Sequence, residues 1–492
     1  MGFAKWFRDH STLPTVADQL KAYEQANACA NAALGATTHT QQPGVITVGT
    51  VIEAEQFPPH TGVVIQGILC RFTEYLLDRH MILIGEIGSG KTTAVLNLLQ
   101  QTACYTARDC FFINFKGERK DDEKARRILE EHRGPIRVIR MDPDNPGWKY
   151  NPFKYGDGLS IANRWIRILG LPHYEGSGEY YADLHRSAIF LICLAQEGPP
   201  RTLEEMERRL NPASDWLNKA YPRGDKNTPP HPKRWRVDLL LEKDGTQQTP
   251  WKKLATKVSP VFENLERFIG EDGLTFDDGS LIISVPASKI SDTAKKIADC
   301  LVEDLKHFMS SRQRKPAQVF WDEFQAAKND SITEFLSQAR SFHCGAVLAT
   351  QDINKLGTDL QQKALTSDTT TCIAFRTQQS ADFVARLSGS IRQARTTLQV
   401  QDGEVDRYSV GEETEYRIHP NDVAQLPDGY CFILRQRTYA KVLFNQPVIP
   451  ANVSEEPIYT PQEHSEVKLD MIEKPQAETT KPKKKPKVNE RK

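Results

Sequence analysis

Short apolar runs recur along the middle of the chain, and polar turns and helical patterns separate them. Runs of this kind are typical of strands that are buried on both faces. Strands that alternate with helices predict an α/β fold with a mostly parallel sheet between layers of helices. The predicted strands are residues 81–85 (MILIG), 110–115 (CFFINF), 136–141 (IRVIRM), 280–286 (SLIISVP), 318–324 (QVFWDEF), 345–351 (GAVLATQ) and 370–376 (TTCIAFR).

The pattern changes between residues 157 and 272, where apolar residues recur with helical spacing and no strand pattern is present. We therefore predict an all-α insertion domain between two strands of the sheet. The predicted helices are residues 160–170, 179–198, 202–211 and 250–270. The insertion would divide the nucleotide-binding domain into residues 61–156 and 273–448.

The two ends of the chain differ in composition from the middle. In the N-terminal segment, residues 1–60, we predict a helix over residues 17–36 and a short hairpin over residues 46–56. Two further hairpins are predicted at 392–418 and 429–444. Residues 449–492 have the composition of a disordered tail. Its last residues, 481–492, carry seven Lys or Arg and one Glu, a net charge of +6. This basic end favours either a solubilising role or contact with an anionic partner.

Overall charge narrows the class of protein. The chain has 492 residues with 64 Lys+Arg and 64 Asp+Glu, so its formal net charge is zero. This excludes a uniformly basic, histone-like coat, and any nucleic-acid contact must come from local patches. The sequence contains no run of 18 apolar residues, the length that would predict a transmembrane segment, and its start lacks the apolar core of a signal peptide. Nine cysteines without a C-x-x-C pair favour a reduced, cytoplasmic protein.

A phosphate-binding loop follows the first predicted strand. Residues 85–92, GEIGSGKT, match G-x-x-x-x-G-K-[ST] between a strand and a helical pattern. Glycines let the backbone N–H groups of such a loop surround phosphates, and the helix N-terminus adds partial positive charge. We predict that Lys91 contacts the β- and γ-phosphates of ATP and that Thr92 ligates Mg²⁺. The predicted nucleotide-binding residues are Gly85, Gly88, Ser89, Gly90, Lys91, Thr92 and Thr93.

Two adjacent carboxylates follow the apolar run Val319-Phe320-Trp321. At the carboxyl end of a strand, Asp322 can bind the Mg²⁺ shell. Glu323 can act as the general base that activates water. A glutamate beside the metal carboxylate is expected in an enzyme that hydrolyses ATP.

Three further residues are predicted to act on the γ-phosphate. Gln351 ends a neighbouring strand and can sense that phosphate. Arg340 and Arg376 are predicted to act on the nucleotide of a neighbouring subunit, and the alternative for each is a solvated surface arginine.

The order of these motifs resembles that of the type IV secretion coupling proteins of conjugation, which belong to the FtsK/HerA branch of RecA-like motor ATPases. The resemblance covers about residues 60–445. It rests on the phosphate loop, FFINFKGE, the run D-P-x-x-P-x-x-x-x-N-P-F at 142–153, WDEF, and the segment from Gln338 to Asp352 (QARSFHCGAVLATQD).

The resemblance implies a hexameric RecA-like ring that couples ATP hydrolysis to DNA transport. Its implied partners are DNA, a relaxase and its complex, and the type IV secretion channel. The expected location is the cytoplasm: either a separate membrane-anchored partner holds the chain at the inner membrane, or the chain is a soluble relative of the family. Two alternatives stay open: a related motor with another cargo, such as a DNA-repair translocase or a protein-secretion ATPase, and a docking hub for the relaxase complex.

This sequence departs from the family pattern in two places. Family members usually begin with two membrane-spanning helices, and no such run occurs here. The second strand usually ends in D-P-K-G, whereas this chain has Asn114-Phe115-Lys116-Gly117. The missing aspartate removes a charge near the nucleotide and leaves the role of Lys116 open.

Overall fold

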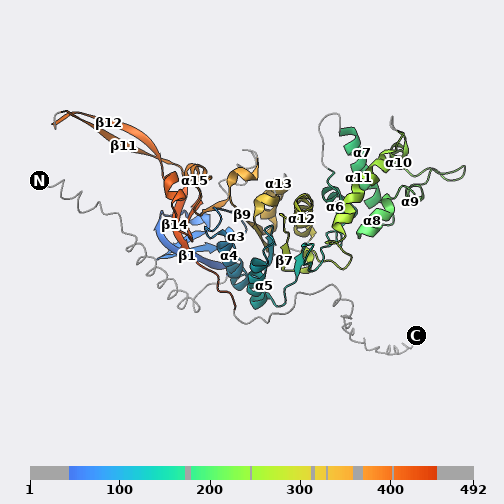
Figure 1. Cartoon of the computed structure of the whole chain (residues 1–492), viewed down its shortest axis with the longest axis horizontal. Coiled ribbons are helices and arrows are strands. Elements are labelled where there is room, and N and C mark those ends of the chain that lie inside the picture. The colour runs from blue at the N-terminus through green and yellow to red at the C-terminus, as the bar shows by residue number, and fades with distance from the viewer. Residues whose placement is uncertain are drawn as a thin grey trace, which may run out of the picture.

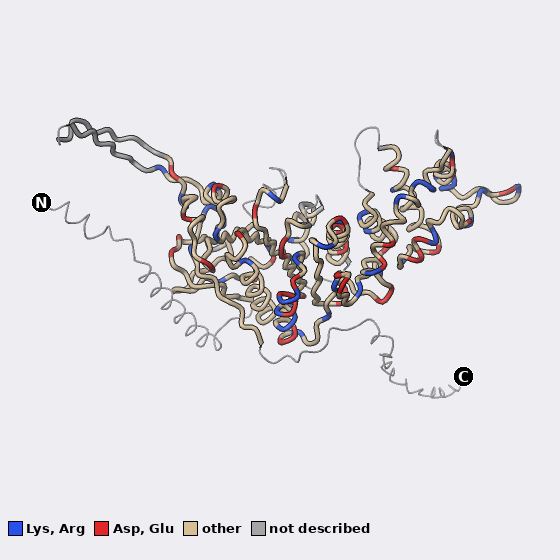
Figure 2. The backbone as a smooth tube through the Cα atoms, in the orientation of Figure 1, with Lys and Arg blue, Asp and Glu red and all other residues tan. Residues whose placement is uncertain are grey.

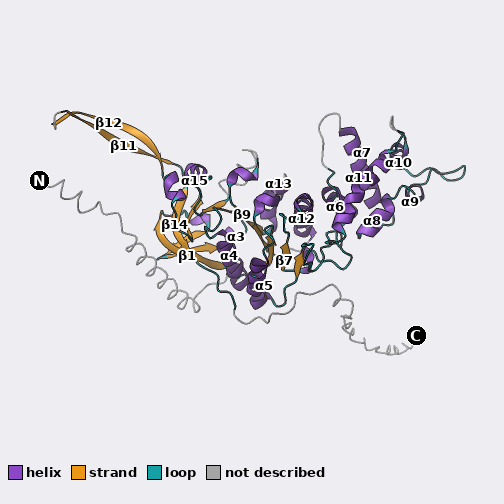
Figure 3. Cartoon of the chain, viewed as in Figure 1, coloured by secondary structure: helices purple, strands orange, loops and turns teal. Residues whose placement is uncertain are grey.

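A computed structural model describes residues 44–171, 179–243, 247–311, 316–327, 331–357, 370–401 and 404–450. Its centre is a twelve-stranded sheet with helices on both faces (Figures 1 and 3). Seven neighbouring strands at one side of the sheet run parallel, and an antiparallel extension of five strands continues from them to the other edge. In spatial order the strands are β2 (Val63–Gln66), β3 (Leu69–Thr73), β1 (Val45–Ala54), β14 (Thr438–Phe444), β13 (Tyr430–Arg435), β10 (Thr371–Ala374), β4 (Met81–Ile84), β9 (Cys344–Thr350), β8 (Ala317–Asp322), β5 (Asp109–Asn114), β7 (Leu281–Ser284) and β6 (Val138–Arg140).

The predicted α/β class and all seven predicted strands are confirmed. The hairpin predicted over residues 46–56 is wrong, because β1 is one continuous strand that pairs with β3 and β14. Its pattern is interrupted by bulges near Gly49 and Ile52, and such bulges break the alternation that identifies a strand. Strands β2 and β3 were not predicted. The hairpin predicted at 429–444 is confirmed as β13 and β14.

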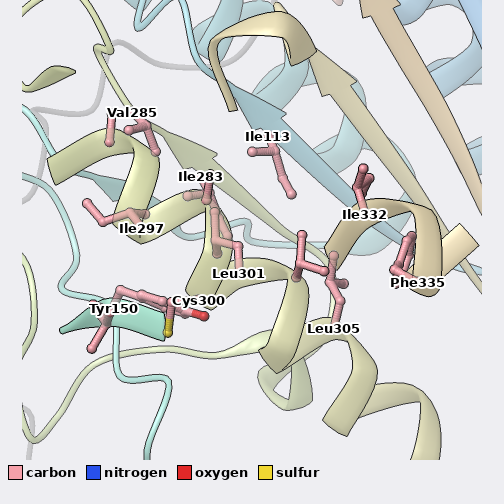
Figure 4. Close-up of a cluster of buried hydrophobic side chains, with 14 of the residues drawn as sticks. Ile113, Tyr150, Ile283, Val285, Ile297, Cys300, Leu301, Leu305, Ile332 and Phe335 are labelled. Carbon is pink, nitrogen blue, oxygen red and sulfur yellow. The ribbon is translucent and has the colours of Figure 1, made fainter. Parts of the chain in front are cut away.

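Helices cover the two faces of the sheet with separate apolar cores. One face packs against α4 (Lys91–Tyr105) and α5 (Arg119–Arg133). The other packs against α12 (Ser291–Ser311) and α13 (Ser331–Ala339). Figure 4 shows Leu301 and Leu305 of α12 in one buried cluster with Ile113 and Ile283 of the sheet and Ile332 and Phe335 of α13. The remaining short helices around the sheet are α3 (Glu74–Leu77), α15 (Ala381–Ser388) and α16 (Pro420–Ala424).

In the described part of residues 158–265, helices are the only regular secondary structure, as the pattern predicted. They are α6 (Gly158–Ile168), α7 (Glu179–Cys193), α8 (Leu203–Leu210), α9 (Trp216–Ala220), α10 (Arg234–Leu241) and α11 (Pro250–Leu265). Helices α7 to α11 extend to one side of the sheet, at the right of Figure 1.

The segment that enters this helical region and the segment that leaves it are hydrogen-bonded to each other at its base. The Asn151 N–H donates to the Leu274 carbonyl at 2.9 Å, and the Leu274 N–H donates to the Lys149 carbonyl at 2.9 Å. The ring of Phe153 stacks on Trp165 of α6 with centroids 3.6 Å apart. The Asn-Pro-Phe segment therefore ties the base of the helical region together.

A buried ion pair connects the helical region to the helix under the sheet. Arg164 of α6 donates to Asp304 of α12 at 2.7 Å, and both side chains are 1% exposed. The hydroxyls of Tyr150 and Thr275 also donate to Asp304, each at 2.8 Å. Burial raises the pKa of Asp304, and the Arg164 guanidinium opposes that shift.

We expect Asp304→Ala to lower the free energy of unfolding by about 3–5 kcal/mol, because it leaves the Arg164 charge buried without its counter-ion. Chemical denaturation monitored by circular dichroism would measure this loss. Asp144→Ala is the matched control, since its ion pair with Lys289 is exposed and should contribute nothing measurable. Equal midpoints for the two variants would contradict the structural role of the buried pair.

A second, two-stranded sheet stands apart from the first. It consists of β11 (Ser390–Gln401) and β12 (Glu404–Tyr416), which form the predicted hairpin at 392–418. The predicted N-terminal helix and most of the basic tail lie outside the described residues. Within the described residues, no helix has both the length and the apolarity needed to cross a bilayer. The described cysteines are free thiols, and all but Cys104 are buried.

Candidate functional site

The phosphate loop connects β4 to α4 at the carboxyl edge of the parallel strands. Gly88 and Gly90 adopt φ of 81° and 107°, a region that side chains with a Cβ disfavour. A Cβ on Gly85 would lie 2.6 Å from the Ser89 hydroxyl and 2.8 Å from Phe375 Cβ. The glycine spacing of the motif is therefore required by the backbone of this loop.

Lys91 lies across the loop, and its side chain is buried. Its Nζ donates to the carbonyls of Gly85 at 2.6 Å and Glu86 at 2.9 Å. Burial lowers the pKa of Lys91, while the carboxylates of Glu323 and Asp322 oppose the shift. A buried cation beside backbone N–H groups at a helix N-terminus is suited to bind phosphate.

Thr92 and Asp322 meet across the site. The Thr92 hydroxyl donates to the Asp322 carboxylate at 2.9 Å, although the two residues lie far apart in the sequence. Burial raises the pKa of Asp322 to about 6, and the Thr92 hydrogen bond partly opposes this shift. One hydroxyl and one carboxylate, completed by phosphate oxygens and water, suit Mg²⁺, which binds few protein ligands in such sites. Within the described residues there is no cluster of three or more His, Cys, Asp or Glu that could form an all-protein metal cage.

Glu323 lies beside Thr92 and Asp322, and its backbone conformation and hydrogen bonds fix its position. Its backbone has φ of 55°, and its N–H donates to Asp322 Oδ1 at 3.1 Å. The Gln351 amide donates to both oxygens of the Glu323 carboxylate, at 3.1 and 2.9 Å. The Gln325 amide also donates to this carboxylate. The left-handed backbone and the two amides hold the carboxylate at the edge of the sheet, where it can accept a proton from water.

Sheet order explains why Gln351 reaches this site. Strand β9, which ends just before Gln351, lies between β4 and β8. The three strands are parallel, so their carboxyl ends meet at one edge. The structure therefore brings together five of the predicted residues, namely Lys91, Thr92, Asp322, Glu323 and Gln351.

The two predicted arginines are not among these five residues. The Arg376 carbonyl accepts from the Glu86 N–H at 2.9 Å, and its guanidinium pairs with Asp428 at 2.8 Å. Arg376 thus flanks the phosphate loop of its own chain. Arg340 precedes β9 and so lies at the opposite, amino edge of the parallel strands, where it is exposed. Thr93 is exposed in the first turn of α4.

Local contacts explain why position 114 has an asparagine where the coupling-protein pattern has an aspartate. Its amide donates to Asp122 at 2.7 Å, and its carbonyl oxygen accepts from the N–H groups of Lys116 and Gly117. Asp122 is fully buried and pairs with Arg140 at 3.2 Å. An aspartate at position 114 would place a second carboxylate against Asp122. Lys116 is exposed and pairs with Glu118 at 2.8 Å.

The sequence pattern placed position 114 near the nucleotide, but it did not identify Gln325 or Asp428 as neighbours of the site. Gln325 could have been noticed, because it lies two residues after Glu323 on the same turn. The roles of Asn114 and Asp428 depend on contacts with residues on other elements.

Comparison with known proteins gives matches in structure alone. No protein-family profile and no curated protein matches the sequence. The bacterial conjugative coupling protein TrwBdeltaN70, in its unbound form, aligns with a TM-score of 0.57 and 14% identity, over 86% of this chain and 97% of its own.

Two further solved structures are similar. TrwB in complex with the non-hydrolysable ATP analogue ADPNP has a TM-score of 0.57 and 14% identity, over 86% of this chain and 99% of its own. VirB4 of Thermoanaerobacter pseudethanolicus has a TM-score of 0.51 and 9% identity, over 83% of this chain and 98% of its own. Identities this low establish shared architecture and no more. The chain therefore shares the RecA-like fold of the conjugative coupling protein TrwB and of VirB4.

Proposed function

We propose that this chain is an ATPase of the type IV secretion and conjugation kind, with ATP as substrate and Mg²⁺ as cofactor. The observation that carries the proposal is the convergence of Lys91, Thr92, Asp322, Glu323 and Gln351 at one sheet edge. Two structural neighbours, TrwB with ADPNP and TrwB with ADP and Mg²⁺, support the choice of ligands.

Each residue has a role that follows from its position. Lys91 exchanges the carbonyls of Gly85 and Glu86 for phosphate oxygens and neutralises their charge. Thr92 and Asp322 hold Mg²⁺, which supplies charge neutralisation at the β- and γ-phosphates. Glu323 takes the proton from the attacking water. Gln351 holds the Glu323 carboxylate and can report the loss of the γ-phosphate along β9.

We further propose that the ATPase forms a hexameric ring and pumps DNA from a relaxase complex to a type IV secretion channel. A membrane-anchored partner would hold it at the cytoplasmic face of the inner membrane. The fold shared with a conjugative coupling protein supports this cargo. Figure 2 shows Lys and Arg interspersed with Asp and Glu along the described chain, so DNA contacts would depend on a few local cations.

The DNA proposal predicts that a truncation ending at Val448 keeps DNA-stimulated ATP turnover, because stimulation would arise from DNA inside the ring. Its DNA affinity should fall steeply with salt, by the release of counterions. Turnover measured with and without DNA, over a salt series, tests both points. The full chain is the control for the basic tail. Loss of both binding and stimulation on truncation would show that the folded body does not bind DNA.

A protein-secretion ATPase is the second candidate, because a site that binds and hydrolyses ATP can serve a protein cargo as well as a DNA cargo. Turnover that responds to a secreted protein and not to DNA would support this alternative. A pure docking hub is less consistent with the site, because a hub that does not hydrolyse ATP has no use for the positioned Glu323 carboxylate.

The two arginines give a paired prediction. We expect Arg340→Ala and Arg376→Ala each to lower ATP turnover by about 10³-fold or more, the effect of losing an arginine that acts on the transferred phosphate. Mixing Arg340→Ala with Lys91→Ala subunits should restore part of the turnover, because Arg340 lies away from its own phosphate loop. Mixing Arg376→Ala with Lys91→Ala should restore none, because Arg376 flanks its own loop.

This mixing experiment requires proof of mixed rings, for example by native mass spectrometry. Restored turnover for Arg376 in proven mixed rings would show that it acts on the neighbouring subunit, as the sequence suggested. Absence of restoration for Arg340 in the same rings would remove its trans-acting role.

A further inference from the structure

A cavity of about 410 Å³ lies where the helical region meets the helices that cover the sheet. Its walls come from α6 and α7 on one side and from α12 and α13 on the other. Figure 1 shows α12 between α13 and α6, and both helices pack against it. Helices α12 and α13 cover the face of the sheet opposite α4, so this α6–α12 cavity is separate from the phosphate loop. Its volume is that of a site for a small organic ligand.

The described lining of the α6–α12 cavity is rich in charged side chains. Arg167 of α6, Arg186 of α7 and Lys306 of α12 carry three positive charges, and Glu303 of α12 carries one negative charge. The formal net charge of this lining is therefore +2. An excess of positive charge in a recessed site attracts an anionic ligand and repels a metal cation.

The cations of the cavity lie close to one another. Glu303 accepts from Lys306 at 3.2 Å and pairs with Arg167 at 3.5 Å, and the side chains of Glu303 and Lys306 are only 12% and 15% exposed. Burial lowers the pKa of Arg186; Asp183 opposes this shift, and the charge of Arg167 adds to it. One carboxylate thus serves two cations while a third cation acts on them. An anion bound in the cavity would relieve this repulsion.

His307 of α12 adds an uncharged polar group to the same cavity. Burial lowers its pKa to about 4; the charge of Arg164 adds to this shift, Asp157 opposes it, and Arg201 adds to it again. At neutral pH the imidazole is therefore neutral and keeps one ring N–H that can donate a hydrogen bond. It contributes a donor for an anion and leaves the net charge of the lining at +2.

The charge of the lining matches one terminal phosphate group. A phosphomonoester carries about −1.5 to −2 charges at pH 7, whereas each phosphate of a nucleic-acid backbone carries one. Guanidinium groups bind phosphate oxygens through paired N–H donors. Ile166 and Leu171 add apolar surface to the same lining, which suits a small organic body attached to the phosphate.

We propose that the α6–α12 cavity binds a small phosphomonoester at a site separate from the ATP site. Arg167, Arg186 and Lys306 bind the phosphate oxygens, and His307 donates a further hydrogen bond. On binding, Lys306 and Arg167 exchange the Glu303 carboxylate for phosphate. The ligand contacts both the helical region and the helices that cover the sheet. This site goes beyond the ATPase activity proposed above and does not require it.

Calorimetric titration of the full chain in phosphate-free buffer tests the site, with inorganic phosphate and ribose 5-phosphate as probes. A Lys91→Ala background weakens phosphate binding at the phosphate loop, so that the second site is observed. In that background, Arg186→Gln with Lys306→Gln should lower the affinity for both probes by at least about tenfold, because two charge-assisted hydrogen bonds are lost. Lys252→Gln with Lys257→Gln is the matched control, since it removes the same charge from exposed positions on α11 and should bind like its parent.

Glu303→Gln should change the affinity in the opposite direction. It removes the carboxylate that competes with phosphate for Lys306 and Arg167, so the affinity for both probes should rise by about tenfold. A variant that had merely lost structure would not bind more tightly, and thermal unfolding of each variant checks its fold. Weaker binding by folded Glu303→Gln would contradict the proposed exchange.

The two probes distinguish the sources of the phosphate. Tighter binding of ribose 5-phosphate supports a phosphomonoester, because only this probe has an organic body that can contact Ile166 and Leu171. Equal or tighter binding of inorganic phosphate would overturn that assignment and leave a site for the free ion.

Two other results would overturn the site altogether. The first is no binding of either probe, or equal binding by the cavity double variant and its α11 control. The second is an oligonucleotide without terminal phosphates whose binding depends on Arg186 and Lys306 while neither probe binds, which would assign the cavity to a nucleic-acid backbone. A wild type without ATP turnover would contradict the proposed function and leave this test unchanged.

Discussion

Lys91→Ala is expected to reduce ATP turnover to background, a loss of at least about 100-fold, because the cation that neutralises the β- and γ-phosphates is removed. Affinity for ATP should fall as well, because the lysine contacts the nucleotide before the reaction as well as during it. Steady-state phosphate release and equilibrium binding of a fluorescent ATP analogue measure the two effects.

The substitution also changes the loop, because Lys91 Nζ donates to the carbonyls of Gly85 and Glu86. A melting curve of the protein without nucleotide separates a loss of structure from a loss of chemistry. Lys120→Ala is the control, since Lys120 is exposed on α5 and takes no part in the site. Turnover within a few fold of the wild type for Lys91→Ala would show that the site is misassigned.

Glu323→Gln should separate binding from hydrolysis. Loss of a general base is expected to lower turnover by about 10²–10⁴-fold. The cradle around Lys91 and Thr92 stays intact, so ATP should still bind with nearly wild-type affinity and remain unhydrolysed. Rapid filtration with radiolabelled ATP would show intact ATP retained on the protein.

Glu118→Gln is the matched control for this variant, because Glu118 lies at the same edge and forms an exposed ion pair with Lys116. Rapid release of ADP by Glu323→Gln would show that another group activates the water. A variant that no longer binds ATP would show that the Glu323 carboxylate supports the phosphate loop itself.

Local sequence determined the parts of this protein that depend on consecutive residues. The phosphate loop requires glycines where the backbone has positive φ, as at Gly88 and Gly90, and the motif records that requirement directly. The central strands are buried on both faces, so each appears as a continuous apolar run. Asp322 and Glu323 were recognisable because two carboxylates directly follow such a run.

Tertiary structure alone decided the features that combine distant elements. Strand β1 joins the large sheet through partners at both sides, and its bulges hid this from the pattern. The bond from Gln351 to Glu323 depends on β9 lying between β4 and β8, an order that no local pattern contains. Arg376 flanks its own phosphate loop because β10 is the neighbour of β4.

Strand pairing and the burial of charged side chains also depend on tertiary structure. The sequence contains the alternating residues of β11 and β12, but only the structure shows that these two strands form a sheet of their own, apart from the large one. It also contains Arg164 and Asp304, but only packing buries them together and makes their pairing necessary. Periodicity follows from local backbone geometry, whereas strand order and burial follow from the packing of the whole chain. For that reason the sequence alone determined the fold class and the phosphate loop, and the tertiary structure decided which distant side chains share the site.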